Sequence, residues 1–434
     1  MSSPHAKPTA KIPSLRPVQP IPLRADDGRA GFFLQDSMQL SREPCVLTAP
    51  AMMIAQFFNG RRSALDVQAE IARLGGGIVP SAVIEQVARV LDQYRLLDNE
   101  TARGAEREIL EAFRAAPVRK PAHAGSAYPV DGRDARELLD GFYSGDGGPG
   151  PLPEPPTNGA GSSRLLGVIA PHIDLRCGGP TIAWAYRALA EAGPFDLAVI
   201  LGVGHYARGW PAIATKKDFE TPLGVSRTDT AFLDRLAGRL ERDLFEDELA
   251  HVREHSVEFQ VLFLQHLAPP GREFRIVPLL CSSFRRSVEK RTEPVEEEPI
   301  AEFVRALSET IREEAGKVVV VAGVDLAHVG PKFGHDRNAD EEFVAEVERK
   351  DREMLARVEA GDAKGFHDYV AAEGDERNIC GHAAIYTMLK VLEPDRPRAK
   401  LLRYDRMVEE PTASAVSFAS LSVEAAEGRE GGSG

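Results

Sequence analysis

Continuous apolar runs alternate with amphipathic segments through most of the chain after residue 164. Four such runs have the length of buried strands, namely RLLGVIAP (164–171), FDLAVILG (195–202), FRIVPLL (274–280) and KVVVVAG (317–323). Segment 180–193, PTIAWAYRALAEAG, instead has helical spacing. Strands that helices cover on both faces are typical of an α/β fold with parallel neighbours. LLRYDR (401–406) and SAVSFASLSV (414–423) predict closing strands that pair antiparallel, so we expect a central mixed sheet flanked by helices.

A smaller, mostly helical unit is predicted over residues 31–100. It starts with a short apolar stretch, GFFLQD, and continues with three helical patterns separated by glycine or proline. Ser63 is placed as an N-cap, and Pro80 stands at the first turn of the third helix. For the rest of the chain we expect a disordered tail over 1–30, a helical linker over 101–120, an α/β domain over 121–424 and a disordered tail over 425–434.

Composition narrows the class of protein. A chain of 434 residues exceeds the size at which one hydrophobic core stops growing, which favours two domains. No run of eighteen apolar residues occurs and the N-terminal stretch is polar, so we expect no membrane segment and a cytoplasmic location. The net charge of -13 argues against nucleic acid as a partner. Four cysteines without a C-x-x-C pair predict reduced thiols.

Candidate metal ligands stand where the predicted strands or buried segments end. These residues are His172, His205 and Cys380. Side chains at the carboxyl ends of strands converge in open α/β sheets. Two imidazoles and one thiolate suit a borderline or soft transition metal and leave a coordination position open. Each residue alone has an ordinary alternative, a loop-packing histidine or an inert buried cysteine. A helix N-terminus and His382 are expected to lower the pKa of Cys380.

Three further residues are candidates for proton transfer or substrate positioning. Asp325 and His328 are close enough in the segment GVDLAHVG to face one pocket. His255 and Glu258 share a predicted helical face in EHSVEFQ. An aspartate cap, a loop histidine and a charged helix start are the alternatives.

The order of these motifs resembles the Memo-like family, known in bacteria as component B of the AmmeMemoRadiSam system. The resemblance covers residues 121–424 and rests on HAGSAYP, APH, LGVGH, TPLG, EHSVEFQ, VDLAH and NICG. It implies metal ligands at His172, His205 and Cys380, with the other candidates lining the same pocket. It also implies a fold similar to class III extradiol dioxygenases, and a radical-SAM enzyme and an Amme-type protein as partners. Residues 32–98 resemble the winged-helix-like PqqD domains, which bind a peptide or partner protein.

The chain departs from the usual pattern of that family close to the predicted ligands. Asp174 lies in a segment where Ala-Gly-Tyr is usual, and Tyr206 stands where a second histidine is common. Groups around the ligands tune a metal, so these changes bear on metal and substrate. The Asp174 carboxylate is itself a candidate ligand or base.

Two classes of function fit these observations. The first is a metal-dependent, redox-capable enzyme with iron or copper, either in a radical-SAM-associated pathway or as an extradiol-type dioxygenase. The second is a scaffold that recruits a peptide or partner enzyme through its pocket and its N-terminal unit. A zinc amidase is disfavoured because the chain lacks an H-E-x-x-H helix. The sequence leaves open whether the site turns over a substrate.

Overall fold

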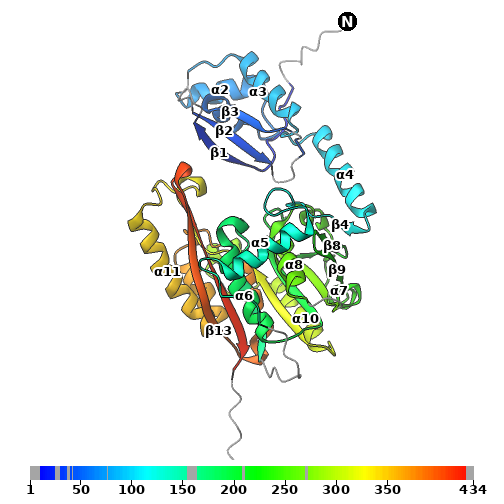
Figure 1. The fold of residues 1–434 in the computed structure, drawn as a ribbon. Helices are drawn as coiled ribbons and strands as arrows, with labels where there is room; N and C mark the ends of the chain where they lie inside the picture. Colours follow the sequence, from blue (N-terminus) through cyan, green and yellow to red (C-terminus); the bar gives the residue numbers. More distant parts are fainter. Residues whose placement is uncertain are drawn as a thin grey trace, which may run out of the picture. The chain divides into compact units, whose positions relative to one another are not determined.

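The protein consists of two compact units, residues 1–115 and 116–434, which we call the N-terminal and C-terminal units (Figure 1). The computed structural model describes residues 10–24, 30–36, 40–41, 43–75, 77–153, 164–207, 211–268 and 272–426. Within them, no helix is long and apolar enough to cross a membrane.

The N-terminal unit is a three-stranded antiparallel sheet covered by helices. The strands, in the order β1-β2-β3, are β1 (Val18–Arg24), β2 (Ala30–Asp36) and β3 (Cys45–Thr48). The helices are α1 (Ala49–Ala55), α2 (Ala64–Arg73), α3 (Ser81–Gln93) and α4 (Glu100–Ala115). Ser63 caps α2 and forms a capping box with Asp66, as expected of serine before an amphipathic helix.

The predicted N-terminal tail is wrong for residues 10–24. Every residue of β1 pairs with β2, and just before β1 Arg16 forms an ion pair of 3.1 Å with Asp36. Pro20 and Pro22 argue against a strand in this part of the sequence, so β1 was not expected. Proline is tolerated here because β1 lies at the edge of its sheet, where a missing N–H costs no ladder hydrogen bond. Residues 1–9 and 25–29, and residues 427–434 of the predicted C-terminal tail, lie outside the described residues.

The C-terminal unit is built on an eleven-stranded mixed sheet. Its centre consists of parallel strands in the order β5 (Leu165–Ala170), β11 (Val318–Gly323), β6 (Leu197–Val203) and β10 (Arg275–Cys281). The antiparallel pair β13 (Pro397–Glu409) and β14 (Ser414–Ala425) closes one side, as predicted. The remaining strands are β4 (Val118–Arg119), β7 (Ala212–Ala214), β8 (Asp218–Thr221), β9 (Gly224–Thr228) and β12 (His328–Val329).

Helices cover both faces of this sheet, which confirms the predicted mixed α/β architecture. In β6, Leu197, Val199 and Leu201 join one apolar cluster, while Ala198 and Ile200 join another. The first cluster includes side chains of α7 (Thr230–Ala237), α9 (Arg285–Lys290), α10 (Glu298–Arg312), α11 (Glu341–Glu359), α12 (Ala363–Ala372) and α13 (His382–Leu392). The second includes side chains of α5 (Gly132–Ser144), α6 (Leu175–Glu191) and α8 (His255–Leu267).

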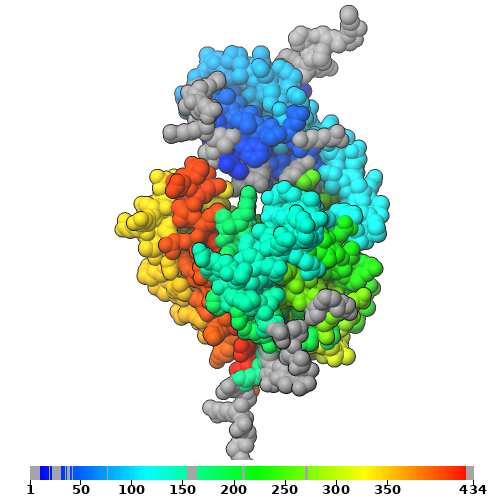
Figure 2. Space-filling model, in the orientation of Figure 1, coloured from blue at the N-terminus to red at the C-terminus, as the bar shows by residue number. Residues whose placement is uncertain are grey.

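The long strand β13 lies at the surface of this unit. Figure 2 shows it in orange-red beside the yellow α11, and most of its residues are only partly buried. Its apolar partner β14 is buried over ten consecutive residues instead. The hairpin therefore shields the parallel strands, and the carboxyl ends of those strands form the site described next.

Candidate metal centre

Three neighbouring parallel strands end at the same edge of the sheet and carry candidate residues just beyond their last residues. His172 follows β5, Asp325 follows β11 and His205 follows β6. Helix α8 starts at His255 and packs closely over this edge. A Cβ atom added to Gly323 would lie 2.5 Å from the Ser256 carbonyl oxygen. Glycine is thus required at the end of β11 to let the start of α8 reach the strand ends.

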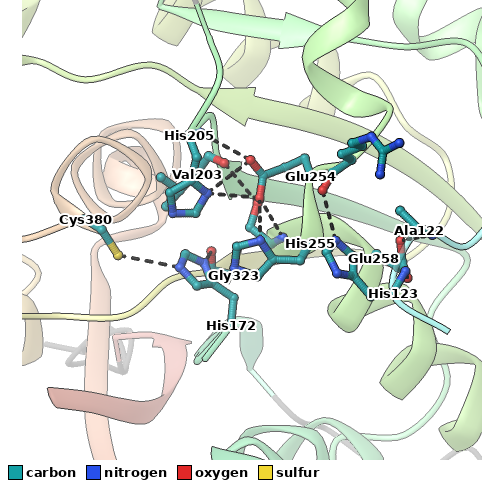
Figure 3. Close-up of polar contacts among 12 residues, drawn as sticks. Ala122, His123, His172, Val203, His205, Glu254, His255, Glu258, Gly323 and Cys380 are labelled. Atoms are coloured by element: carbon teal, nitrogen blue, oxygen red, sulfur yellow. Dashed lines mark hydrogen bonds and ion pairs between the residues drawn. The ribbon is translucent and has the colours of Figure 1, made fainter. Parts of the chain in front are cut away.

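The rings of His172, His205 and His255 converge at this edge (Figure 3). One nitrogen from each ring lies within 4.8 Å of the others, and the three ring centroids are 5.0 Å apart in every pair. His172 is buried, whereas the side chains of His205 and His255 are 30% and 27% exposed. The His172 side of the cluster is therefore buried, and the opposite side is open to solvent. The cluster could hold a metal ion.

Polar contacts fix the orientation of the three imidazoles, through hydrogen bonds for His172 and His205 and an ion-pair contact for His255. His172 Nδ1 lies 2.8 Å from the Gly323 carbonyl oxygen, which can only accept, so Nδ1 carries the proton. Glu254 Oε1 lies 3.0 Å from His205 Nδ1 and 3.3 Å from His255 Nδ1, and Figure 3 shows its carboxylate between the two rings. These contacts leave the Nε2 lone pairs for a metal. Carboxylate or carbonyl partners on the far nitrogen are typical of metal-binding histidines.

Cys380 lies beside this cluster but is not one of its three mutually close donors. Its Sγ lies 3.7 Å from His172 Nε2 (Figure 3). Two such ligands of one tetrahedral ion are about 3.6 Å apart, given metal distances of about 2.3 Å for sulfur and 2.1 Å for nitrogen. The chain beside Cys380 packs tightly, because a Cβ on Gly381 would lie 2.6 Å from the Asp325 carbonyl oxygen. The donor set therefore fits a transition metal.

The expected lowering of the Cys380 pKa is wrong. Burial raises the pKa of this thiol well above its usual range, and the nearby Asp325 carboxylate adds to the rise. His382 does not lower the pKa of Cys380, because its ring stacks on His367, with 2.9 Å between His367 Nδ1 and His382 Nε2. Burial lowers the pKa of His382 to about 3, so it is neutral. A bound metal ion would itself favour the thiolate.

The pKa values of two of the three histidines suit metal binding. Burial, and then the charge of His205, lower the pKa of His172 to about 3, and burial lowers that of His255 well below its usual range. Both rings are therefore neutral at pH 7, as ligands must be. For His205, burial acts to lower the pKa, but the Glu254 carboxylate outweighs it and the pKa is raised.

Asp325 and His328 lie next to the cluster. Asp325 Oδ1 accepts hydrogen bonds from the backbone N–H groups of His172 (3.0 Å) and Ile173 (3.2 Å), and Oδ2 lies 3.5 Å from His172 Nε2. Burial raises the pKa of Asp325 to about 6. His328 Nδ1 is 3.1 Å from the Leu326 carbonyl oxygen, and its ring packs on Phe333. Asp325 thus fixes the backbone of the His172 turn, and the roles of both residues in proton transfer stay predictions.

Two acidic residues have roles that were not expected from the sequence. Glu254 was missed, although it directly precedes His255. A glutamate at a helix start suggests a cap, and it does accept from Ser256 N–H at 2.9 Å while it also orients two histidines. Asp174, a candidate ligand in the sequence, instead caps α6 and forms an ion pair with Arg176. Helix α6 thus begins five residues before Pro180, where the sequence pattern placed its start.

Known proteins match most of this chain. The family model for Memo-like protein matches residues 119–422. A MEMO1 family protein of Aquifex aeolicus is 27% identical over 391 residues, covering 90% of this chain and 95% of the relative. One of Methanopyrus kandleri is 33% identical over 66% of this chain and 91% of the relative. One of Thermus thermophilus is 29% identical over 83% of this chain and 98% of the relative. The Aquifex and Thermus matches cover more residues than the C-terminal unit contains, so the similarity extends into the N-terminal unit.

Proposed function

The chain belongs to the family of Memo-like proteins, and on this premise we propose that its C-terminal unit binds one iron or copper ion. His172, His205 and Cys380 are the ligands in this proposal, and His255 is a further donor. The convergence of three imidazole nitrogens within 4.8 Å is the observation that carries it. The sulfur beside His172 favours a soft or borderline ion over a hard one.

A redox-active ion would supply electron transfer or activation of a bound substrate, and the protein would supply orientation and access. Glu254 and Gly323 hold the imidazoles in the required tautomer. The exposed edges of His205 and His255 leave a path for a substrate from solvent. We assign proton transfer to Asp325 and His328, which lie next to the cluster. We place the reaction in a radical-SAM-associated modification pathway, with a radical-SAM enzyme and an Amme-type protein as partners.

The metal content of protein purified without oxygen tests the ligand assignment. Elemental mass spectrometry should find near-stoichiometric iron or copper in the native chain and little in His172→Ala and Cys380→Ser. Matched controls are His335→Ala and Cys177→Ser, which change a partly buried histidine and an exposed thiol outside the cluster and should keep the metal. A native chain that takes up no metal even after reconstitution would refute the proposal.

A dioxygenase reaction is a narrower version of this proposal. It takes support from the fold similar to class III extradiol dioxygenases that the sequence resemblance implies, and from the accessible side of the cluster. The metal-loaded chain should then consume O2 in the presence of an aromatic diol. Absence of both O2 uptake and diol binding would exclude this version and leave metal binding intact.

A scaffold role is the second candidate, and the surface of the N-terminal unit favours it. Among the described residues, six of nine exposed large hydrophobic side chains belong to this unit: Val46, Met53, Leu65, Leu74, Ile78 and Val83. Exposed apolar residues that gather in one small unit are typical of interaction sites. We propose that this unit is winged-helix-like and binds a peptide or partner enzyme. Titration of the full chain with the purified radical-SAM enzyme should show binding that Leu74→Ser and Ile78→Ser weaken, and equal binding by these variants would contradict it.

A further inference from the structure

The chain enters the C-terminal unit through residues 116–128, which we call the connecting segment. Its own strand, β4, is only two residues long and pairs with β8 through Val118 and Arg119. Two residue pairs by themselves would hold only weakly a segment that directly follows the N-terminal unit. Lys217 donates to the Ala116 carbonyl oxygen at 2.6 Å and Lys120 pairs with Glu220 near the same strand. The buried polar contacts of the segment are made to helix α8, which begins with His255, and to the turn before it.

Arg119 is the main link between the connecting segment and the turn that precedes α8. Its side chain is 1% exposed. Nε donates to the His251 carbonyl oxygen at 3.0 Å, and Nη2 donates to the Glu254 carbonyl oxygen at 2.8 Å. Nη1 forms an ion pair with the fully buried Glu258. A single side chain therefore holds both the backbone of Glu254 and the first turn of α8.

Glu258 binds the connecting segment in return. Its carboxylate accepts hydrogen bonds from the backbone N–H groups of Ala122 (2.9 Å) and His123 (3.0 Å), and from the Tyr128 hydroxyl. His123 Nε2 lies 2.9 Å from the Arg253 carbonyl oxygen, to which it donates. Three carbonyl groups of the turn before α8 are thus satisfied by donors from the connecting segment.

We propose that the connecting segment is a positioning element of the metal centre, so that its docking on α8 and metal binding strengthen each other. The inference rests on the proposed metal site. Arg119 fixes the backbone of Glu254, whose carboxylate orients His205 and His255. Metal–ligand distances tolerate about 0.2 Å, so a small shift of this turn misplaces two donors at once. Thermodynamic linkage then requires the reverse effect: a bound ion must hold the connecting segment more firmly.

The affinity for Fe²⁺ without oxygen, measured against a competing chelator, tests this coupling. Arg119→Lys keeps the charge but cannot donate all three of these hydrogen bonds in the same geometry, and it should weaken binding about fivefold or more. The matched control is Arg16→Lys, another buried arginine that pairs with a carboxylate and a carbonyl, but within the N-terminal unit. This control can lower the melting temperature as much, yet it should bind Fe²⁺ as the native chain does. If Arg119→Lys does not fold, Tyr128→Phe removes a single bond to Glu258 and serves in its place.

Amide hydrogen exchange gives the reverse measurement on the native chain. Addition of Fe²⁺ should slow exchange at Ala122 and His123, whose N–H groups reach Glu258, and leave helix α2 unchanged. Native affinity in the substituted chain, or equal exchange with and without Fe²⁺, would overturn the coupling. A native chain that binds no Fe²⁺ at all would instead refute the proposed metal site.

Discussion

Glu254→Gln alters the carboxylate that His205 and His255 share. In the native chain the two carboxylate oxygens accept from His205 Nδ1–H and from the backbone N–H groups of His205 and Ser256, and Oε1 also lies 3.3 Å from His255 Nδ1. Glutamine has nearly the same shape but replaces one acceptor oxygen by a donor NH2 group. One imidazole must then lose its acceptor or change tautomer, and a changed tautomer places a proton on the Nε2 atom that should bind the metal.

The size of the effect follows from the hydrogen bond that the substitution removes. A hydrogen bond to a charged group contributes about 1.5–3 kcal/mol. Removal of one such bond corresponds to an increase of about 10- to 150-fold in the Kd for the metal. Because Glu254 is 1% exposed, solvent screens this interaction little. We therefore expect the Kd of Glu254→Gln to rise by this factor, while the fold is kept.

Chelator competition with Fe²⁺ at pH 7, without oxygen, measures this Kd. Glu248→Gln is the matched control, since Glu248 lies in the same stretch before α8 and accepts from Thr215 at 2.6 Å, apart from the histidines. It should keep the native Kd. An affinity of Glu254→Gln within twofold of the native value would show that the orientation of His205 and His255 does not depend on this carboxylate.

The remaining predictions concern packing around the site and a helix distant from it. Gly323→Ala should lower the free energy of unfolding by about 1–3 kcal/mol, because its Cβ would lie 2.5 Å from the Ser256 carbonyl oxygen. Gly141→Ala, which meets no atom within 4 Å, should instead raise it by about 0.4–1 kcal/mol; urea unfolding compares the two, and equal effects would refute the packing argument. Asp340→Ala removes the cap of α11, a 2.8 Å bond from Phe343 N–H, and should cost about 0.5–2 kcal/mol in the same assay. Its metal Kd should stay native, and a change would show that α11 supports the site.

Local pattern explains why much of the architecture could be predicted. Apolar runs such as 317–323 give a strand buried on both faces whatever the partners are, and the structure has β11 there. The same reasoning failed where pairing, not composition, makes the strand. Strand β1 forms despite its prolines because each of its residues pairs with a residue of β2. No pattern within residues 18–24 indicates this pairing partner.

The sequence by itself determined which side chains could carry chemistry and that they follow strand ends, because these are properties of neighbouring residues. Only the tertiary structure decided their partners. His172 meets Cys380 across 208 positions, and Arg119 meets Glu258 across 139. Contacts at such separations depend on strand order and helix packing, which local spacing does not encode. The same holds for pKa values: the helix start beside Cys380 suggested a low pKa, and burial, a property of the whole fold, raises it.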